Sequence, residues 1–263
     1  MKKLTLIKIG GNVIDDAEKL QHFLKAFADL EGYKILVHGG GKMATKLADE
    51  MGITAKMVNG RRITDKETLR IVTMVYAGLI SKNLVAQLQT QNCNAIGLSG
   101  ADGNLIKAKK RPVAAIDYGF VGDLDEKSIE TNNLSKLIDN GFIPVFSAIT
   151  HDGESQLLNT NADTIASAIA VAMVKHYETS LIYCFEKKGV LIDVNDENSV
   201  IREINPDKYQ DLTQKGIIAD GMLPKLHNAF EAINKGVKEV FIGKADDLSE
   251  IKKGKSFGTR LIK

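Results

Sequence analysis

Short apolar runs alternate along the chain with longer segments in which apolar residues recur every three or four positions. The short runs indicate buried strands, and the longer period indicates helices with one buried face. Strands are predicted at 4–9, 34–37, 95–98, 143–147, 181–185, 239–242 and 259–262. Helices are predicted at 16–30, 42–51, 65–89, 133–140, 164–174, 207–215 and 222–235. This order predicts an α/β fold, a three-layer αβα sandwich with a mostly parallel central sheet.

Two segments depart from this alternation and indicate antiparallel hairpins. The first, 107–120, is predicted to turn at 109–112, and the second covers 154–158. A second α/β portion begins soon after His176. We therefore expect two lobes, residues 1–176 and residues 177–263.

The bulk properties are those of an ordinary soluble globular protein. The chain has 263 residues, 44% of them hydrophobic, and its net charge of +2 gives no reason to expect nucleic acid or a membrane surface as a partner. Cys93 and Cys184 lie in apolar contexts and are expected to be buried, reduced thiols. The longest apolar helix, at 165–174, is too short to span a bilayer, and the N-terminus carries no signal-peptide pattern. We expect a cytoplasmic protein.

Glycine turns follow the first two predicted strands. Lys8 ends the first apolar run just before glycines 10 and 11, and the second run ends in His38 and three glycines at 39–41. Glycines at the carboxyl end of a strand aim backbone N–H groups at an anion, and Lys8 adds a positive charge. Alone, the first turn is equally an ordinary connection, but the third consecutive glycine of the second suggests close approach to a ligand. Two such turns predict a site for two anionic groups, as a small-molecule kinase requires.

Further polar residues at predicted turns and helix starts are candidates for ligand contacts, although each has an ordinary structural explanation. Arg62 follows an Asn-Gly turn and is able to clamp a carboxylate with two hydrogen bonds, or is a solvated turn residue. Asn161 is a predicted N-cap and Asp163 suits the first turn of its helix, which leaves Asn159 unexplained. Lys225 lies in the first turn of a later helix, where an exposed lysine is ordinary.

Other nucleotide and metal motifs are missing from the sequence. The glycines at 39–41 resemble the end of a P-loop, but Leu36 and Met43 stand where glycine and Ser or Thr are required. The five histidines have no metal-ligand spacing, and segment 193–204 lacks the glycine and the final glutamate of a calcium loop. We therefore predict no metal held by protein ligands.

Taken together, the motifs resemble those of the amino acid kinase family. They are Lys8-x-Gly10-Gly11, His38-Gly39-Gly40-Gly41, Asn59-Gly60-x-Arg62-x-Thr64, Asn159-x-Asn161-Ala162-Asp163 and Asp220-Gly221-Met222-x-x-Lys225. The resemblance extends through Arg260. The lysine-glycine turn is shared by aspartate, carbamate, uridylate and glutamate 5-kinases, whereas the triple glycine and the two asparagine-containing segments point to the member that acts on N-acylglutamate.

One segment departs from the family pattern. The family usually has Ser/Thr-Asp-Val-x-Gly after the first strand of the nucleotide lobe, whereas this chain has Phe185-Glu186-Lys187-Lys188-Gly189. The departure affects the expected contacts to adenine and ribose and leaves the phosphate-handling residues in place.

The resemblance implies a reaction. The γ-phosphoryl group of ATP would pass to the side-chain carboxylate of N-acetyl-L-glutamate, or of another N-acylglutamate, to give an acyl phosphate in arginine biosynthesis. Lys8 and Lys225 would offset charge on the transferring phosphoryl group, and Asp163 would hold both ammonium groups in place. Mg²⁺ would arrive with ATP and be held largely by its phosphates.

The resemblance also assigns residues to the two substrates. Those for the amino acid are Gly40, Gly41, Arg62 and Asn159, the last two gripping the α-carboxylate and the acylamide. Those for the nucleotide are Gly10, Gly11, Glu186, Gly189, Ile217 and Met222. Acylglutamate binding and dimerisation are expected in the first lobe and ATP binding in the second.

Alternatives to N-acetylglutamate as substrate stay open at this point. N-succinylglutamate is one, because the basic residues at 109–111 could reach an extra carboxylate, although a solvated hairpin tip is the simpler interpretation. Another is an aspartate or glutamate 5-kinase. A third is a non-catalytic amino acid sensor on the same fold, which the retention of both lysines and the aspartate disfavours.

Assembly is inferred from the start of the chain. Arginine-inhibited members of the family carry a helix before the first strand that links dimers into a hexamer, whereas here the first predicted strand begins at Leu4. We therefore expect a C2 homodimer formed through the first lobe, without arginine inhibition. The expected partners are small-molecule substrates only.

Overall fold

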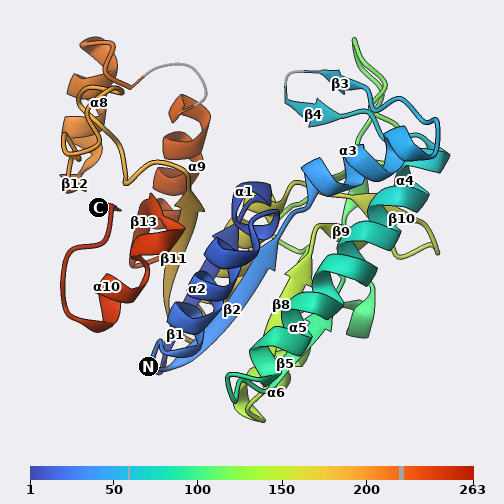
Figure 1. Cartoon of the computed structure of the whole chain (residues 1–263), viewed down its shortest axis with the longest axis horizontal. Helices are drawn as coiled ribbons and strands as arrows, with labels where there is room; N and C mark the ends of the chain where they lie inside the picture. The colour runs from blue at the N-terminus through green and yellow to red at the C-terminus, as the bar shows by residue number, and fades with distance from the viewer. Residues whose placement is uncertain (59, 219–221) are drawn as a thin grey trace. The chain divides into compact units, whose positions relative to one another are not determined.

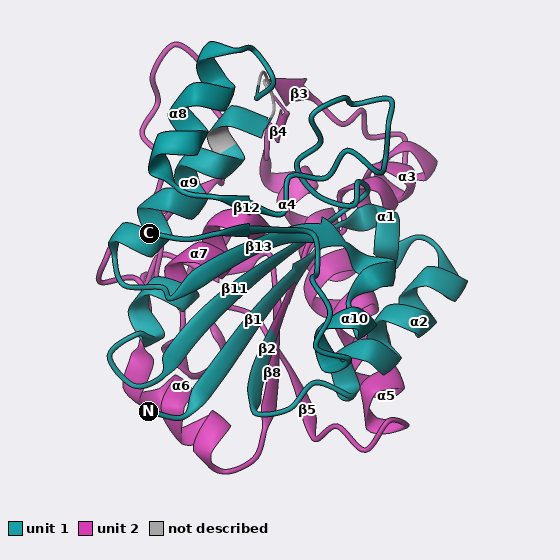
Figure 2. Ribbon diagram, turned by 90° about the vertical axis from the view of Figure 1, so that its left-hand side faces the viewer, with its two compact units in different colours: residues 1–35, 169–263 teal, residues 36–168 magenta. Residues whose placement is uncertain are grey.

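The computed structural model describes residues 1–58, 60–218 and 222–263 (Figure 1). The chain divides into two compact units (Figure 2). Unit 1 comprises Met1–Ile35 and Ile169–Lys263, and unit 2 comprises Leu36–Ala168. This division differs from the lobe boundary expected near His176. The reason is that β1 (Lys3–Ile9) pairs in parallel with β11 (Glu178–Phe185), which groups the start of the chain with its C-terminal part.

Unit 1 is built on a sheet whose strand order is β12-β14-β13-β11-β1. β1, β11 and β13 (Glu239–Lys244) are parallel. β14 (Thr259–Leu261) runs antiparallel to β13, and β12 (Glu203–Ile204) is parallel to β14. The side chains of Leu4, Leu6, Ile7 and Ile9 in β1 are fully buried. A strand buried on both faces explains the continuous apolar run that the sequence shows.

Helices cover both sides of this sheet. α2 (Ala17–Ala28) and α10 (Ser249–Lys252) lie on one side and α9 (Leu223–Asn234) on the other (Figure 2). α2 begins where the Asp16 side chain accepts a hydrogen bond from the Lys19 N–H at 3.1 Å, which is an N-cap. The remaining elements of this unit are α1 (Gly11–Ile14), α8 (Pro206–Gln214) and the 3₁₀ turn η4 (Ala245–Asp247).

Unit 2 contains a parallel sheet in the order β2-β8-β5. The strands are β2 (Tyr33–His38), which the unit boundary crosses, β8 (Ile143–Ser147) and β5 (Ala95–Leu98). α6 (Thr131–Asp139) and α5 (Ser81–Gln89) both pack on β8. Parallel strands joined by right-handed crossovers require helices on both sides, because the chain moves along the sheet in both directions here. Other elements of this unit are α3 (Gly41–Glu50), β3 (Met57–Val58), β4 (Arg61–Arg62) and η2 (Asp102–Asn104).

The helix predicted at 65–89 is continuous but not uniform. α4 (Lys66–Thr73) leads into a π-helical segment, η1 (Met74–Ile80), and then α5. The stretch 66–89 is long and apolar enough to cross a membrane by length and composition, so the expectation that 165–174 is the longest such helix is wrong. Its buried side chains pack against the rest of unit 2, as those of a core helix do.

The two hairpins differ from the sequence prediction. β6 (Lys109–Lys110) pairs antiparallel with β7 (Gly122–Asp123), so the residues predicted to turn form a strand instead. Strands of two polar residues have no alternating pattern from which their register could be read. β9 (Ile149–His151) pairs with β10 (Leu157–Asn159), so the second hairpin exists, with strands on either side of the predicted segment.

The expected fold class is confirmed. The main sheet strands of each unit are mostly parallel, with helices on both sides, which is the predicted α/β architecture. α7 (Ala162–Met173) begins in unit 2 and ends in unit 1.

Candidate functional site

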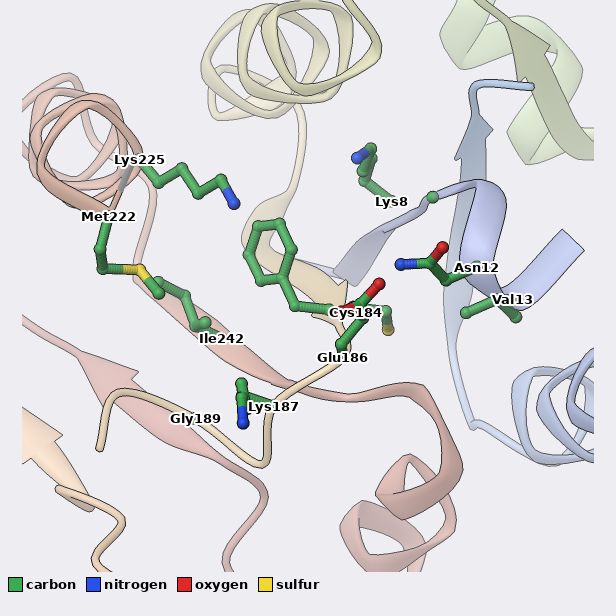
Figure 3. A pocket seen from close by; sticks show the side chains of 12 residues that line it. Lys8, Asn12, Val13, Cys184, Glu186, Lys187, Gly189, Met222, Lys225 and Ile242 are labelled. Atoms are coloured by element: carbon green, nitrogen blue, oxygen red, sulfur yellow. The ribbon is translucent and has the colours of Figure 1, made fainter. Parts of the chain in front are cut away.

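Unit 1 contains a cavity of about 360 Å³ at the carboxyl ends of β1 and β11 (Figure 3). Lys8 reaches toward it from the end of β1, and Lys225 reaches toward it from the first turn of α9. The structure therefore brings these two predicted catalytic lysines to one cavity. Its walls are formed by Lys8, Gly10, Asn12, Val13, Cys184, Phe185, Glu186, Lys187, Gly189, Met222, Lys225 and Ile242.

The turn after β1 is open toward this cavity. Gly10 is the N-cap of α1 and has φ −101°, which any residue can adopt, and an added Cβ would meet only the Lys8 Nζ at 3.8 Å. Neither backbone strain nor packing within the protein therefore requires glycine at this position. Close approach of a ligand is the remaining reason for it. Gly11 begins α1, but it does not line the cavity.

The segment that departs from the family pattern forms one wall of the cavity. Phe185 ends β11, and the exposed Glu186 and Lys187 follow it. Cys184 is buried beneath them, and burial raises the pKa of its thiol to about 12. This thiol is therefore protonated at neutral pH and is a poor nucleophile. Cys93 is also buried and free, as expected.

Three residues that were predicted to contact the nucleotide differ in their position relative to the cavity. Met222 and Gly189 line the cavity, whereas Ile217 does not. A Cβ on Gly189 would lie 2.7 Å from the Thr259 Oγ1, so packing inside unit 1 explains this glycine without a ligand. The same Thr259 hydroxyl accepts a hydrogen bond from the Val190 N–H at 2.8 Å. Asp220 and Gly221 of the motif before Met222 lie outside the described residues.

In unit 2 the triple glycine follows β2, and its three residues are not equivalent. An added Cβ on Gly40 would meet the Ile80 Cδ1 at 2.3 Å, so the protein itself requires glycine there. At Gly39 it would meet nothing within 4 Å, and at Gly41 only the Arg62 and Tyr76 side-chain ends at 3.9 Å. Gly39 and Gly41 are thus the two positions that packing leaves open.

His38 fixes the backbone of this loop. Its side chain is fully buried, and its Nδ1 lies 2.8 Å from the Gly39 carbonyl oxygen. Because a carbonyl only accepts, Nδ1 carries the proton and donates. Burial lowers the pKa of His38 to about 4, so the ring is neutral at pH 7. In a trans peptide, fixing the Gly39 carbonyl also fixes the Gly40 N–H, which points the opposite way.

Arg62 lies at the end of β4, and its side chain is 8% exposed. Its Nη2 donates to the Gly41 carbonyl oxygen at 2.9 Å and to the Thr45 Oγ1 at 2.8 Å. The Tyr76 hydroxyl is a further hydrogen-bond partner of this guanidinium, which has five N–H donors in all. The guanidinium is therefore held by the start of α3 while donors remain for a carboxylate. Asn59, in the turn before it, lies outside the described residues.

Asn159 ends β10 and is linked to the Arg62 segment. Its Nδ2 donates to the Thr64 Oγ1 at 3.0 Å, and that hydroxyl donates to the Arg62 carbonyl oxygen at 3.1 Å. Thr64 is fully buried. One hydroxyl thus joins two predicted substrate residues that are 97 positions apart in the sequence.

The start of α7 matches the structural explanation offered by the sequence. Asn161 Oδ1 accepts a hydrogen bond from the Thr164 N–H at 3.0 Å, so Asn161 is the N-cap. Asp163 lies in the first turn and is half-buried. Its carboxylate suits the positive end of the helix dipole.

The side chains of the basic residues at 109–111 all make contacts within unit 2. Arg111 Nε donates to the Asp123 Oδ2 at 3.0 Å, and Lys109 Nζ lies 2.9 Å from the Asp125 Oδ2. Lys110 Nζ lies 4.7 Å from the centroid of the Phe120 ring. These contacts fit the simpler interpretation of a structural basic hairpin.

Several site residues were not found from the sequence. Asn12, Ile242 and Phe185 line the unit 1 cavity, and Thr45 and Tyr76 flank Arg62. The signal in the sequence that pointed to any of them was the departure from the family pattern at Phe185-Glu186. Over the part of the chain that the structure describes, no three His, Cys, Asp or Glu side chains are grouped to hold a metal ion.

Comparisons with known proteins show the family of this chain. The chain is 55% identical over 262 residues to acetylglutamate kinase of Parabacteroides distasonis, covering 100% of both. It is 55% identical over 264 residues to acetylglutamate kinase of Cytophaga hutchinsonii, covering 100% of this chain and 99% of the relative. Carbamate kinase from Giardia lamblia bound to AMP-PNP has the same fold, with TM-score 0.65, 16% identity and coverage of 100% of this chain and 98% of that one. The sequence model of the amino acid kinase family matches residues 3–244, and the chain therefore belongs to this family.

Proposed function

We propose that this chain is an ATP-dependent phosphotransferase that converts N-acetyl-L-glutamate into its side-chain acyl phosphate, a step of arginine biosynthesis. The observation that carries the proposal is the full-length match, at 55% identity, to two proteins named acetylglutamate kinase. The two lysines at the unit 1 cavity and the buried arginine of unit 2 are the groups that such a reaction needs.

The chemistry needs charge stabilisation and positioning more than proton transfer. A carboxylate nucleophile is already ionised at pH 7, so no general base is required. The main obstacle is repulsion between this nucleophile and the polyphosphate, and phosphoryl transfer is catalysed largely by placing positive groups on the transferring phosphoryl. We assign this role to Lys8 and Lys225, and the role of holding their ammonium groups to Asp163.

Unit 1 is proposed to bind ATP. Gly10 and Gly11 would donate backbone N–H groups to phosphate oxygens, with Glu186, Gly189, Ile217 and Met222 nearer to the nucleoside. The contribution of Gly189 would be indirect, since packing against Thr259 already requires it. Mg²⁺ would arrive with ATP and be bound largely by its phosphates.

Unit 2 is proposed to bind the amino acid substrate. Arg62 retains donors for the α-carboxylate. Asn159, whose side chain is hydrogen-bonded to Thr64, is assigned to the acylamide. Gly40 and Gly41 would supply backbone N–H groups. The acetyl substrate is favoured over the succinyl one because Lys109 and Arg111, the candidate partners of an extra carboxylate, are already paired with Asp125 and Asp123.

We also propose a cytoplasmic homodimer that forms through unit 2. The location is supported by the two cysteines, which are free and buried, as is usual in a reducing compartment. The η1 segment exposes Met74 and Leu79, which are 43% and 52% exposed, on a helix whose other face is buried. A second copy of the same segment would cover these side chains across a two-fold axis.

The test is a substrate panel with a product trap. The chain is incubated with MgATP and N-acetyl-L-glutamate, N-succinyl-L-glutamate, L-glutamate or L-aspartate, and hydroxylamine captures any acyl phosphate as a hydroxamate. We expect the highest kcat/KM with N-acetyl-L-glutamate and one hydroxamate per ADP. A higher value for the succinyl compound would change the substrate assignment. Binding of an acylglutamate without hydroxamate from any substrate would establish the sensor alternative instead.

A further inference from the structure

The phenylalanine that ends β11 lies beside both lysines of the unit 1 cavity. The Nζ of Lys225 is 4.1 Å from the centroid of the Phe185 ring, and the Nζ of Lys8 is 5.8 Å from it. The lysines come from different elements, α9 and β1, and Figure 3 shows both side chains directed toward the cavity. Both ammonium groups are within the distance of about 6 Å over which a cation and an aromatic ring attract each other.

The ring is not part of the hydrophobic core. Phe185 is only half-buried and lines the cavity, whereas Tyr183 and Cys184 just before it are buried. An apolar ring beside a cavity that takes polyphosphate has no obvious advantage for binding an anion. The negative faces of its π-system, however, attract ammonium groups that lie near the ring.

The neighbouring Tyr183 side chain fixes the orientation of the Phe185 ring. Side chains two residues apart on a strand point to the same face, so Tyr183 and Phe185 are neighbours on β11. Their ring centroids are 6.0 Å apart with an interplanar angle of 24°. Because Tyr183 is 3% exposed, its ring has little room to move and holds the Phe185 ring in a stacked position. The ring therefore offers a fixed surface to flexible lysine side chains.

We propose that Phe185 is a positioning residue for phosphoryl transfer, whose ring gathers the Lys8 and Lys225 ammonium groups at one cavity before the nucleotide binds. The proposal rests on the proposed phosphotransferase function, in which both lysines act on the transferring group. A four-carbon lysine side chain has many conformations, and a ring contact reduces their number without neutralising the charge. Because the contact is weaker than an ion pair, the phosphates can take over the lysines when ATP arrives.

Removing the ring is expected to affect turnover more than ATP binding. In Phe185→Leu the side chain stays apolar, but the π-face is lost, so the lysines spend less time in the productive position. We expect kcat to fall about fivefold, which corresponds to an exposed cation–ring contact, while the KM for ATP changes less than twofold. Phe185→Tyr keeps the ring and is expected to retain wild-type kcat.

A second readout reports the contact itself. Protein labelled with ¹³C at lysine Cε is examined by NMR without nucleotide, because protons above an aromatic ring resonate upfield. The Lys225 signal, identified by its loss in Lys225→Ala, is expected to be upfield in the wild type and in Phe185→Tyr, and to move to the ordinary lysine position in Phe185→Leu. Phe241→Leu is the matched control, since Phe241 is a half-buried aromatic on the neighbouring strand β13 that packs near Phe257. It is expected to keep the Lys225 shift and the kcat.

The outcomes separate this proposal from the function it rests on. A Lys225 signal at the ordinary position in the wild type, or one unchanged by Phe185→Leu, overturns the ring contact. A lost shift with unchanged kcat overturns the positioning role. If thermal unfolding shows that Phe185→Leu is not folded, Phe185→Met is measured in its place under the same criteria. A wild type that shows the shift but transfers no phosphate overturns the proposed function, and the kinetic part of this proposal with it, while the ring contact stands.

Discussion

In unit 2 the candidate substrate residues are joined to one another by hydrogen bonds, whereas in unit 1 the two candidate catalytic lysines reach into a cavity. Arg62, Thr64 and Asn159 form one connected network, and two of the three side chains are buried. The ammonium groups of Lys8 and Lys225 instead lie 5.8 Å and 4.1 Å from the centroid of one aromatic ring. The first arrangement is rigid and directional, and the second is electrostatic and adaptable.

This difference matches two different tasks. Discriminating an acylated amino acid from a free one depends on hydrogen bonds at fixed positions, because an unpaired buried polar group is costly. Offsetting charge that moves during transfer requires positive groups that can follow it within a limited range. The comparison therefore predicts that substitutions in unit 1 change mainly kcat and that substitutions in unit 2 change mainly the KM for the amino acid.

The largest expected effect tests the unit 1 side of this comparison. We expect Lys8→Ala and Lys225→Ala each to lower kcat by about 10²–10³, because each removes a preorganised positive group from the developing charge. Steady-state kinetics with both substrates varied gives kcat and both KM values. Lys215→Ala, which removes a surface lysine paired with Asp211, is the matched control. Near-normal turnover with a collapsed ATP affinity would make the lysine a ground-state anchor and would remove the contrast between the units.

The next prediction concerns the rigidity of unit 2 and follows from His38. The unfolded chain binds a proton at this ring below pH 6.5, whereas in the folded chain burial lowers the pKa to about 4. Between these values the unfolded state holds more protons, so stability decreases as the pH falls through this window. We expect a loss of about 3 kcal/mol in the free energy of unfolding between pH 7 and pH 4 from this residue.

Chemical denaturation at a series of pH values measures this loss. His38→Gln removes the titrating group but keeps a donor for the Gly39 carbonyl, so its unfolding free energy should depend less steeply on pH. His176→Gln, a change at an exposed histidine, is the matched control. Equal pH slopes for the wild type and His38→Gln would show that the loop does not depend on a buried neutral ring.

The sequence predicted the framework of both units well and their small elements poorly. The strand predicted at 143–147 is β8 at the same positions, because a parallel strand covered on both faces is an unbroken apolar run. β6 and β7 have two residues each, and β6 consists of two lysines, so no period marks them. β12, which pairs with β14 and also has two residues, was missed for the same reason.

The site was predicted in its residue types but not in its connections. The glycines at 39–41 look identical in the sequence, yet only Gly40 is required by contact with Ile80. That contact depends on how the η1 helix packs in unit 2, which no local pattern contains. Likewise, the unusual Phe185 was visible as a departure, but its contact with Lys225 depends on the position of α9.

A smaller effect is expected at Arg62, where a substitution tests whether unit 2 determines mainly the KM for the amino acid. Arg62→Lys keeps the charge but loses the planar fork that bonds Gly41 and Thr45 and that is proposed to bind the substrate carboxylate. We expect the KM for the amino acid to rise about tenfold or more, as for the loss of a hydrogen bond to a charged group, with kcat and the KM for ATP little changed. Initial rates over a range of N-acetyl-L-glutamate concentrations test this. An unchanged KM would place Arg62 outside the substrate site.

The smallest expected effect isolates the hydroxyl that connects the unit 2 network. Thr64→Val has the same shape but removes the acceptor of Asn159 Nδ2 and the donor to the Arg62 carbonyl. Loss of the hydrogen bond that holds the Asn159 side chain costs about 1 kcal/mol, which corresponds to a rise of about fivefold in the KM for the amino acid at unchanged kcat. Thr64→Ser keeps the hydroxyl and should behave as the wild type in the same assay. If Thr64→Val lowered kcat as strongly as Lys225→Ala while leaving KM unchanged, the unit 2 network would act on the transfer step itself, and the division of tasks between the two units would be wrong.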